Sequence, residues 1–400
     1  MIFKISYVIK TALIFFLIYD IGFSFAPSIT SGRFVFLGLC LFYFFRYKNF
    51  RVNKDAFVFF AVLLILNIVA IFQFINSDDF KQSSRLFWFT IYSIITPFLL
   101  LKIFKDKIDF LNAFFIATTI QSIITIGSFL NPEFKQFILS AIVVGGNDIK
   151  DGFRAIGFTS ASGAAFSVIQ FCGVFSGLML LKYTRDSLIK SIFILIFIVI
   201  GLLSTLIIGR TGLLCSIIAI IYFLFINFNL KKAILYSVIT FIISQINFIN
   251  LLENQTEGID GFNIEFFKNW IEDGFILKNN NTVEAISRMP IPPLSLNTIV
   301  GTGEVFDAEK SVNASGHDSG YIQTYFSLGF IFAIVFYISY FLFLIRITKL
   351  KNLLILLFLI FILFVVEFKE PFIFKYILPF YILTLTVLYD KERNVPLLNK

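Results

Sequence analysis

The sequence has few charged residues, a single histidine and only three cysteines in a chain of 400 residues. Lys, Arg, Asp and Glu together make up 14% of it, whereas hydrophobic residues make up 58%, and the mean hydropathy is +0.89. This balance excludes a set of soluble domains, because a surface that faces water needs more charge. Cys40, Cys172 and Cys215 all lie inside apolar runs and form no CxxC pair, so we expect neither a disulfide nor a zinc site.

Apolar segments follow one another along almost the whole chain. A membrane-spanning helix needs about 20 mostly apolar residues. We therefore expect an all-α, polytopic membrane protein with about twelve transmembrane helices, folded as one integral membrane domain over residues 1–400. The predicted spans are residues 5–25, 31–45, 56–75, 86–103, 109–130, 163–181, 190–208, 211–228, 233–250, 320–345, 352–367 and 372–389.

The loops between these predicted spans differ in charge. Lys and Arg are concentrated in the loops on the same side as the N-terminus, such as RYKNFRVNKD (46–55) and KYTRDSLIK (182–190). The positive-inside rule places these loops in the cytoplasm, and with an even number of spans both termini are predicted to be cytoplasmic. The net charge of +8 then reflects orientation, and no nucleic-acid partner is expected.

Two loops on the opposite, exterior side are long enough to fold over the membrane surface. They are residues 131–162 and residues 251–318, and the second is the only long polar interval in the chain. Apolar residues at helical spacing around Trp270, opposite charged ones, predict a helix lying in the headgroup region. A similar surface helix is expected from Phe134 to Val144. Because chemistry in a membrane protein needs access to water, we expect the functional site on this side.

Three arginines near the ends of predicted spans lie on the exterior side. Arg210 stands in a Gly209–Gly212 turn that interrupts a long apolar run, where insertion of an arginine costs about 2.5 to 3.5 kcal/mol. Arg154 and Arg288 lie in the two long loops. Each arginine could simply contact lipid phosphates at the surface. Together, however, they favour an anion such as a diphosphate, because the planar guanidinium offers paired donors and stays charged.

His317 and Asp318 stand directly before the predicted tenth span. Asp318 could be the N-cap of that helix, because a short carboxylate accepts its free N–H groups. His317 could be an ordinary loop residue. In a functional interpretation, His317 is a general base near neutral pH, and the chain holds no other histidine for that task.

The order of these features resembles the bacterial O-antigen polymerase (Wzy) and O-antigen ligase (WaaL) superfamily. The resemblance covers residues 154–344 and rests on the order, the spacing and the shared side of short motifs. These motifs are an R-x-x-G (Arg154, Gly157), a GRTGLL-type hairpin (Arg210), an SR with a later GTG (Arg288, Gly301, Gly303) and a DSGY-type start to the next span (Asp318 to Tyr321).

The resemblance implies a GT-C-like membrane glycosyltransferase of the bacterial inner membrane, acting on the periplasmic face. Its donor is an undecaprenyl-diphosphate-linked oligosaccharide, and it uses no metal, nucleotide sugar or other cofactor. Its partners are membrane lipid and a chain-length-regulating protein. The polymerase transfers the growing glycan to the next lipid-linked repeat unit, whereas the ligase transfers it to lipid A core. Ligases tend to have a histidine at the position of His317 and polymerases an aspartate like Asp318; the DSGY sequence favours the polymerase.

We hypothesise an inverting displacement in which Arg210 and Arg288, with Arg154, bind the diphosphate. His317, or Asp318 if the histidine only orients it, accepts the proton of the attacking hydroxyl. Two other classes stay open: a flippase or transporter of lipid-linked oligosaccharide, and a structural membrane subunit. A transporter should carry ionisable residues near the membrane midplane, whereas here they gather at the ends of the predicted spans.

Overall fold

The structure is a computed structural model of the chain, and it is mostly helical. The predicted ninth span (233–250) and the surface helix around Trp270 lie outside the described residues. The structure describes residues 5–46, 53–144, 155–184, 187–226, 288–307, 312–348 and 353–394.

Five of the described helices are long and apolar enough to cross a membrane. The other predicted spans within the described residues coincide with helices that are shorter or interrupted, so the number of about twelve spans stays a prediction. The five helices are α3 (Lys54–Ser77), α6 (Lys107–Leu130), α8 (Gly163–Tyr183), α9 (Leu188–Ile208) and α17 (Phe330–Ile347).

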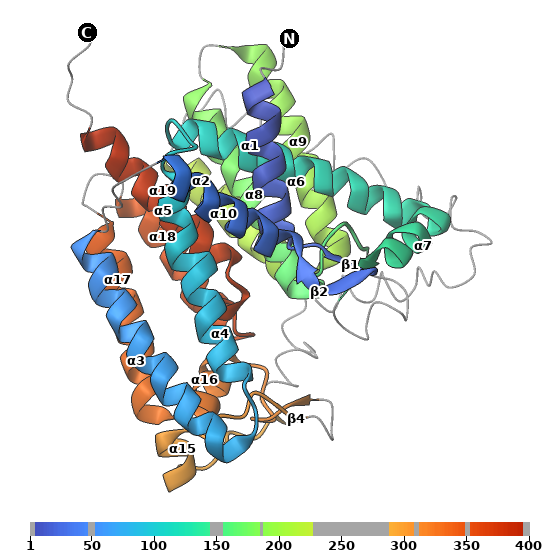
Figure 1. Cartoon of the computed structure of the whole chain (residues 1–400). Coiled ribbons are helices and arrows are strands. Elements are labelled where there is room, and N and C mark those ends of the chain that lie inside the picture. The colour runs from blue at the N-terminus through green and yellow to red at the C-terminus, as the bar shows by residue number, and fades with distance from the viewer. Residues whose placement is uncertain are drawn as a thin grey trace. The chain divides into compact units, whose positions relative to one another are not determined.

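Contacts divide the chain into two compact units, which we describe separately: Met1–Val35 with Leu111–Asn281, and Phe36–Phe110 with Thr282–Lys400. In the first unit, α8 packs on both α9 and α10 (Figure 1). Its residues from Phe166 to Leu181 are all buried. Besides α8, α9 and most of α6, the first unit contains α1 (Ile5–Tyr19), α7 (Pro132–Ala141) and α10 (Arg210–Ile226).

Glycine and serine let the helices of the first unit approach each other closely. A Cβ atom on Gly212 of α10 would lie 2.0 Å from the carbonyl oxygen of Ser167 on α8. Small residues at such positions are typical of helix packing in membranes, where van der Waals contact replaces the hydrophobic effect. Buried polar side chains bind one another across the helices: the Ser122 hydroxyl donates to Oε1 of Gln170, 3.1 Å away.

A small antiparallel sheet departs from the predicted all-α fold. It consists of β1 (Gly22–Phe23), β2 (Ala26–Thr30) and β3 (Ile142–Val143) in the order β2-β1-β3. The predicted first span, 5–25, is therefore too long: α1 ends at Tyr19 and the chain turns at Asp20, whose φ is 41°. The helix expected near Phe134 is present as α7.

In the second unit, α3 and α17 lie side by side along much of their length (Figure 1). Phe59 of α3 stacks on Phe343 of α17 with ring centroids 4.7 Å apart. The other elements of this unit are most of α2 (Ser31–Arg46), α4 (Lys81–Phe89), the π-helix η1 (Thr90–Ile95), α5 (Thr96–Leu100), α15 (Leu296–Val300), β4 (Phe306–Asp307), β5 (Val312–Asn313), α16 (Gly320–Leu328), α18 (Leu353–Glu367), the 3₁₀ turn η5 (Ile373–Lys375) and α19 (Ile377–Asn394).

Two predicted continuous spans in this unit are interrupted. The span predicted over 86–103 passes from α4 through the π-helix into α5, where Pro97 lacks the N–H of a regular helix. The span predicted over 320–345 is divided at Gly329, whose φ is 97°. A Cβ atom there would lie 2.4 Å from the carbonyl carbon of Val300, so the break requires glycine both for its backbone angle and for space.

Candidate functional site

The residues expected to form the site are divided between the units. Arg154 lies outside the described residues. Arg210, partly exposed, is the first residue of α10 in the first unit, whereas Arg288, His317 and Asp318 belong to the second unit.

Two segments far apart in the sequence meet beside Asp318. Its backbone N–H donates to the sulfur of Met289 at 3.4 Å, so the residue that follows Arg288 packs against the start of α16. Both Arg288 and Asp318 are exposed. The Asp318 Oδ1 atom accepts a hydrogen bond of 3.1 Å from the side-chain amide of Asn313. The structure therefore holds an exposed carboxylate next to the segment that carries an exposed arginine.

Asp318 is not the N-cap of the helix that follows it. The helix α16 begins at Gly320, Ser319 occupies the cap position, and that residue makes no capping bond with its side chain. The free backbone N–H of Ser319 is instead satisfied by His317, and the side-chain amide of Gln323 donates to the Asp318 carbonyl oxygen at 2.9 Å. The capping interpretation is therefore wrong, and the Asp318 carboxylate takes no part in starting the helix.

The surroundings of His317 define which of its nitrogen atoms carries the proton. The side chain is 6% exposed, and its Nδ1 atom accepts a hydrogen bond of 3.0 Å from the backbone N–H of Ser319. A neutral imidazole has one acceptor and one donor nitrogen, so the hydrogen lies on Nε2. In this arrangement His317 can donate a hydrogen bond from Nε2 but has no lone pair left there to accept a proton. Asp318, by contrast, presents an exposed carboxylate, whose oxygen atoms are acceptors only.

The glycines of the GTG motif attach the loop to the C-terminal end of α16. The N–H groups of Thr302 and Gly303 donate to the carbonyl oxygens of Phe326 and Ser327 at 3.0 and 2.9 Å. These carbonyls are among those that a helix end leaves without partners. A Cβ atom on Gly301 would lie 2.4 Å from the carbonyl carbon of Leu328. The position requires glycine because the two backbones approach each other so closely.

Gln73 of α3 also links the end of α15 to the end of α16. Its Nε2 atom donates to the carbonyl oxygens of Val300 at 2.6 Å and of Leu328 at 2.9 Å. The side chain is 5% exposed. Sequence reasoning missed it, because a glutamine inside an apolar span shows no sign of partners that lie more than 200 residues away.

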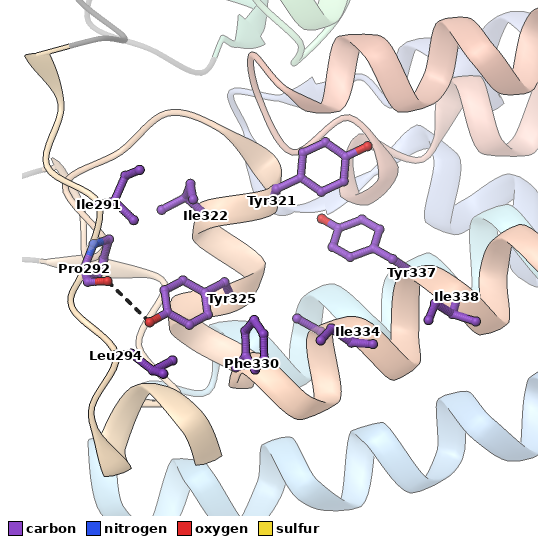
Figure 2. A pocket seen from close by; sticks show the side chains of 11 residues that line it. Ile291, Pro292, Leu294, Tyr321, Ile322, Tyr325, Phe330, Ile334, Tyr337 and Ile338 are labelled. Atoms are coloured by element: carbon purple, nitrogen blue, oxygen red, sulfur yellow. Dashed lines mark hydrogen bonds between the residues drawn. The ribbon is translucent and has the colours of Figure 1, made fainter.

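An apolar groove of about 640 Å³ is lined in part by α16, starting at Tyr321, three residues after Asp318 (Figure 2). The chain after Pro290 forms one wall, and α16 and α17 form the others. Tyr325 links two of the walls, because its hydroxyl donates to the carbonyl oxygen of Pro292 at 3.3 Å. Tyr321, the last residue of the DSGY motif, also lines the groove, and its hydroxyl donates to the carbonyl oxygen of Phe364 at 2.8 Å. Other lining residues are Ile291, Leu294, Phe330 and Tyr337.

A buried acidic residue, missed by the sequence analysis, lies behind this groove. Glu367, the last residue of α18, is 0% exposed. Its Oε1 atom accepts from the Tyr337 hydroxyl at 2.9 Å, and its Oε2 atom accepts from the backbone N–H of Ile373 at 2.8 Å. Arg85 of α4 lies with its guanidinium 4.7 Å from the ring centre of Phe374. The sequence does contain a sign of this site: Glu367 is a single carboxylate at the end of an otherwise apolar segment.

Among the described residues, no group of three or more His, Cys, Asp or Glu side chains could hold a metal ion. The chain matches no family model, no curated protein and no solved structure in the comparisons made. The fold and the site thus define a mostly helical membrane protein. Its second unit contains an exposed carboxylate, a histidine N–H and an adjoining apolar groove.

Proposed function

We propose that the protein is a polysaccharide repeat-unit polymerase that transfers a glycan from undecaprenyl diphosphate to a lipid-linked acceptor at the periplasmic face of the bacterial inner membrane. The observation that carries the proposal is the exposed Asp318 carboxylate, next to the Arg288 segment and to an apolar groove. A lipid-linked sugar needs these three features together: a base for the attacking hydroxyl, a cation for the phosphate and an apolar surface for the hydrocarbon chain.

In the proposed transfer, a hydroxyl oxygen of the acceptor sugar attacks the anomeric carbon of the donor, and the bond from that carbon to the diphosphate oxygen breaks. Asp318 accepts the proton of the attacking hydroxyl. Arg288 stabilises the charge that develops on the leaving diphosphate. The sequence also predicts Arg210 and Arg154 as diphosphate ligands, and this part of the proposal rests on the sequence alone. His317 donates a hydrogen bond from Nε2 to an anionic oxygen, which replaces the role of base that the sequence suggested first.

A chain-length assay in cells that lack the gene tests the role of Asp318. Asp318→Asn should lower the rate of polymer formation by about 10² to 10⁴-fold, because general-base catalysis contributes that much. Its membrane level and its thermal unfolding midpoint should stay at wild-type values. Glu304→Gln, which changes another exposed carboxylate of the same unit, is the matched control and should leave polymer length unchanged. Full-length polymer from Asp318→Asn would refute the assignment.

The same assay shows whether His317 acts as a hydrogen-bond donor or as a general base. Glutamine keeps an N–H donor near the position of Nε2 but cannot act as a base. His317→Gln should therefore retain more activity than His317→Ala, whereas a base would be lost equally in both. Analysis of the products distinguishes the alternatives: longer lipid-linked chains indicate a polymerase, glycan on lipid A core a ligase, and transfer between membrane leaflets without chemistry a flippase.

A further inference from the structure

We infer that Glu367 is a positioning residue for Asp318: with Tyr337 it fixes the first turn of α16, directly after the proposed base. The inference rests on the proposed function for its catalytic consequence. Its structural part, that Glu367 holds the Asp318–Gly320 turn in place, stands on the contacts alone.

The first residue of α16 lies directly on the Glu367 carboxylate. A Cβ atom on Gly320 would lie 2.4 Å from Oε1 of Glu367 and 2.6 Å from the Cα atom of Pro371. Only a glycine allows the backbone to come this close. Gly320 is two residues after Asp318, so a displacement of the carboxylate moves the turn that carries the proposed base.

Tyr337 of α17 ties the same turn to Glu367. Its hydroxyl oxygen lies 2.9 Å from Oε1 of Glu367, 3.2 Å from the carbonyl oxygen of Gly320 and 3.1 Å from Oγ1 of Thr324. A carboxylate is a stronger acceptor than a carbonyl, so the Tyr337 hydrogen is directed to Glu367. The hydroxyl has only this one hydrogen, so its contacts with the Gly320 carbonyl oxygen and with Thr324 are close packing of the tyrosine against the first and second turns of α16.

A carboxylate is an unfavourable choice at this position unless it does more than fill space. Burial of a charge is costly, and the C-terminal end of a helix carries partial negative charge, which disfavours a further negative group at the end of α18. Arg85 and Lys375 attract the Glu367 carboxylate and offset part of this cost. A neutral side chain would avoid the cost altogether. The bonds from Tyr337 and from the Ile373 N–H instead fix the carboxylate at the point where the backbone of Gly320 packs on it.

Three variants of the full-length protein test the inference. Glu367→Gln keeps the shape and removes the charge, and Tyr337→Phe removes only the hydroxyl. Tyr340→Phe is the matched control on the same helix, because the Tyr340 hydroxyl is buried without a hydrogen-bond partner among the described residues. Hydrogen–deuterium exchange of the peptide over residues 315–321 reports on the turn. Polymer formation from purified lipid-linked repeat units reports on catalysis.

We expect Glu367→Gln and Tyr337→Phe each to speed exchange of residues 315–321 by about tenfold, as the loss of a hydrogen bond to a charged group implies. The kcat should fall by a similar factor while KM for the donor stays unchanged. Tyr340→Phe should change neither. The double variant of Glu367 and Tyr337 should lose little more than either single variant, because both act through one network.

Unchanged exchange in both variants would overturn the inference, as would faster exchange with an unchanged kcat. An equal rise over the whole second unit would also overturn it, because that result indicates general destabilisation. If the wild-type protein forms no polymer, the proposed function fails, and the exchange comparison with Tyr340→Phe still decides whether Glu367 fixes the turn.

Discussion

In the first unit, regular helices pack through small residues, whereas in the second unit helices are interrupted and buried polar side chains fill the breaks. Gly212 brings α10 onto the backbone of α8, and neither helix is broken. In the second unit the break at Gly329 leaves carbonyl groups without helical partners, and Gln73 binds one of them, that of Leu328. An interruption in a buried helix releases backbone polar groups that other residues must satisfy.

The difference teaches where a site can form in a membrane protein of this kind. A regular helix satisfies its own backbone and offers a uniform surface. An interrupted helix brings helix ends, loop N–H groups and polar side chains together, and it opens space beside them. The start of α16, with Asp318 on its exposed side and Glu367 beneath it, has this character. The groove lined by Tyr325 and Phe330 flanks the break at Gly329.

The most severe test of this contrast changes one glycine in each unit. Gly212→Ala places a methyl group 2.0 Å from the Ser167 carbonyl oxygen, so we expect a loss of about 3 kcal/mol in unfolding free energy, as for overpacked cores. Gly38→Ala in α2 meets nothing within 4 Å and should be neutral or stabilise by roughly 0.5 kcal/mol. Thermal unfolding midpoints in detergent measure both. Equal midpoints would show that close helix approach does not hold the first unit together.

A second test removes the hydrogen bonds that Gln73 makes at the break between α16 and α17. Gln73→Leu leaves the carbonyl oxygens of Val300 and Leu328 without its amide, and a buried unsatisfied group costs about 1 to 3 kcal/mol. Asn67→Leu is the control on the same helix, because within the described part of the chain the Asn67 amide binds only the Leu63 carbonyl, one turn away. We expect a lower thermal midpoint and faster exchange over residues 300–303 for Gln73→Leu alone. Equal effects of the two variants would refute the role of Gln73.

The sequence located most helices well, because apolar length is a local property. The predicted spans 163–181 and 190–208 differ from α8 and α9 by only a few residues. The interruptions escaped prediction for the same reason: Gly329 lies in an apolar run, where a glycine is tolerated in a helix. Its left-handed φ follows from contact with Val300, which is close in space but not adjacent in sequence.

The site shows the same limit. His317 and Asp318 were identifiable because they are polar residues at the edge of an apolar segment. Their roles were not, since the choice between base and donor depends on the bond from the Ser319 N–H to Nδ1. Glu367 escaped notice because its partners, Tyr337 and Gly320, come from other helices. Residue type thus predicts where a site is expected, whereas the contacts that decide between the proposed roles depend on the fold.

The smallest effect is expected at Asp20, in the turn after α1. Burial raises the pKa of its carboxyl group, although the Thr30 side chain, the hydrogen bond from the Gly32 N–H and the charge of Arg33 oppose the shift. A pKa that is higher in the folded state favours folding at low pH, and this contribution is lost as pH rises through the raised pKa. Asp20→Asn should therefore gain stability relative to wild type as pH rises, by less than the roughly 1 kcal/mol of one hydrogen bond.

Thermal midpoints at several pH values between acid and neutral measure this trend. Asparagine tolerates the positive φ of 41° at this position, so the substitution tests charge and not backbone strain. Asp78→Asn is the control, because Asp78 also has a positive φ, 56°, but is exposed. A trend with pH in Asp20→Asn and not in Asp78→Asn would show that even the first unit, with its regular helices, carries a half-buried ionisable group where the chain leaves a helix. The absence of a trend in both would confine that feature to the second unit.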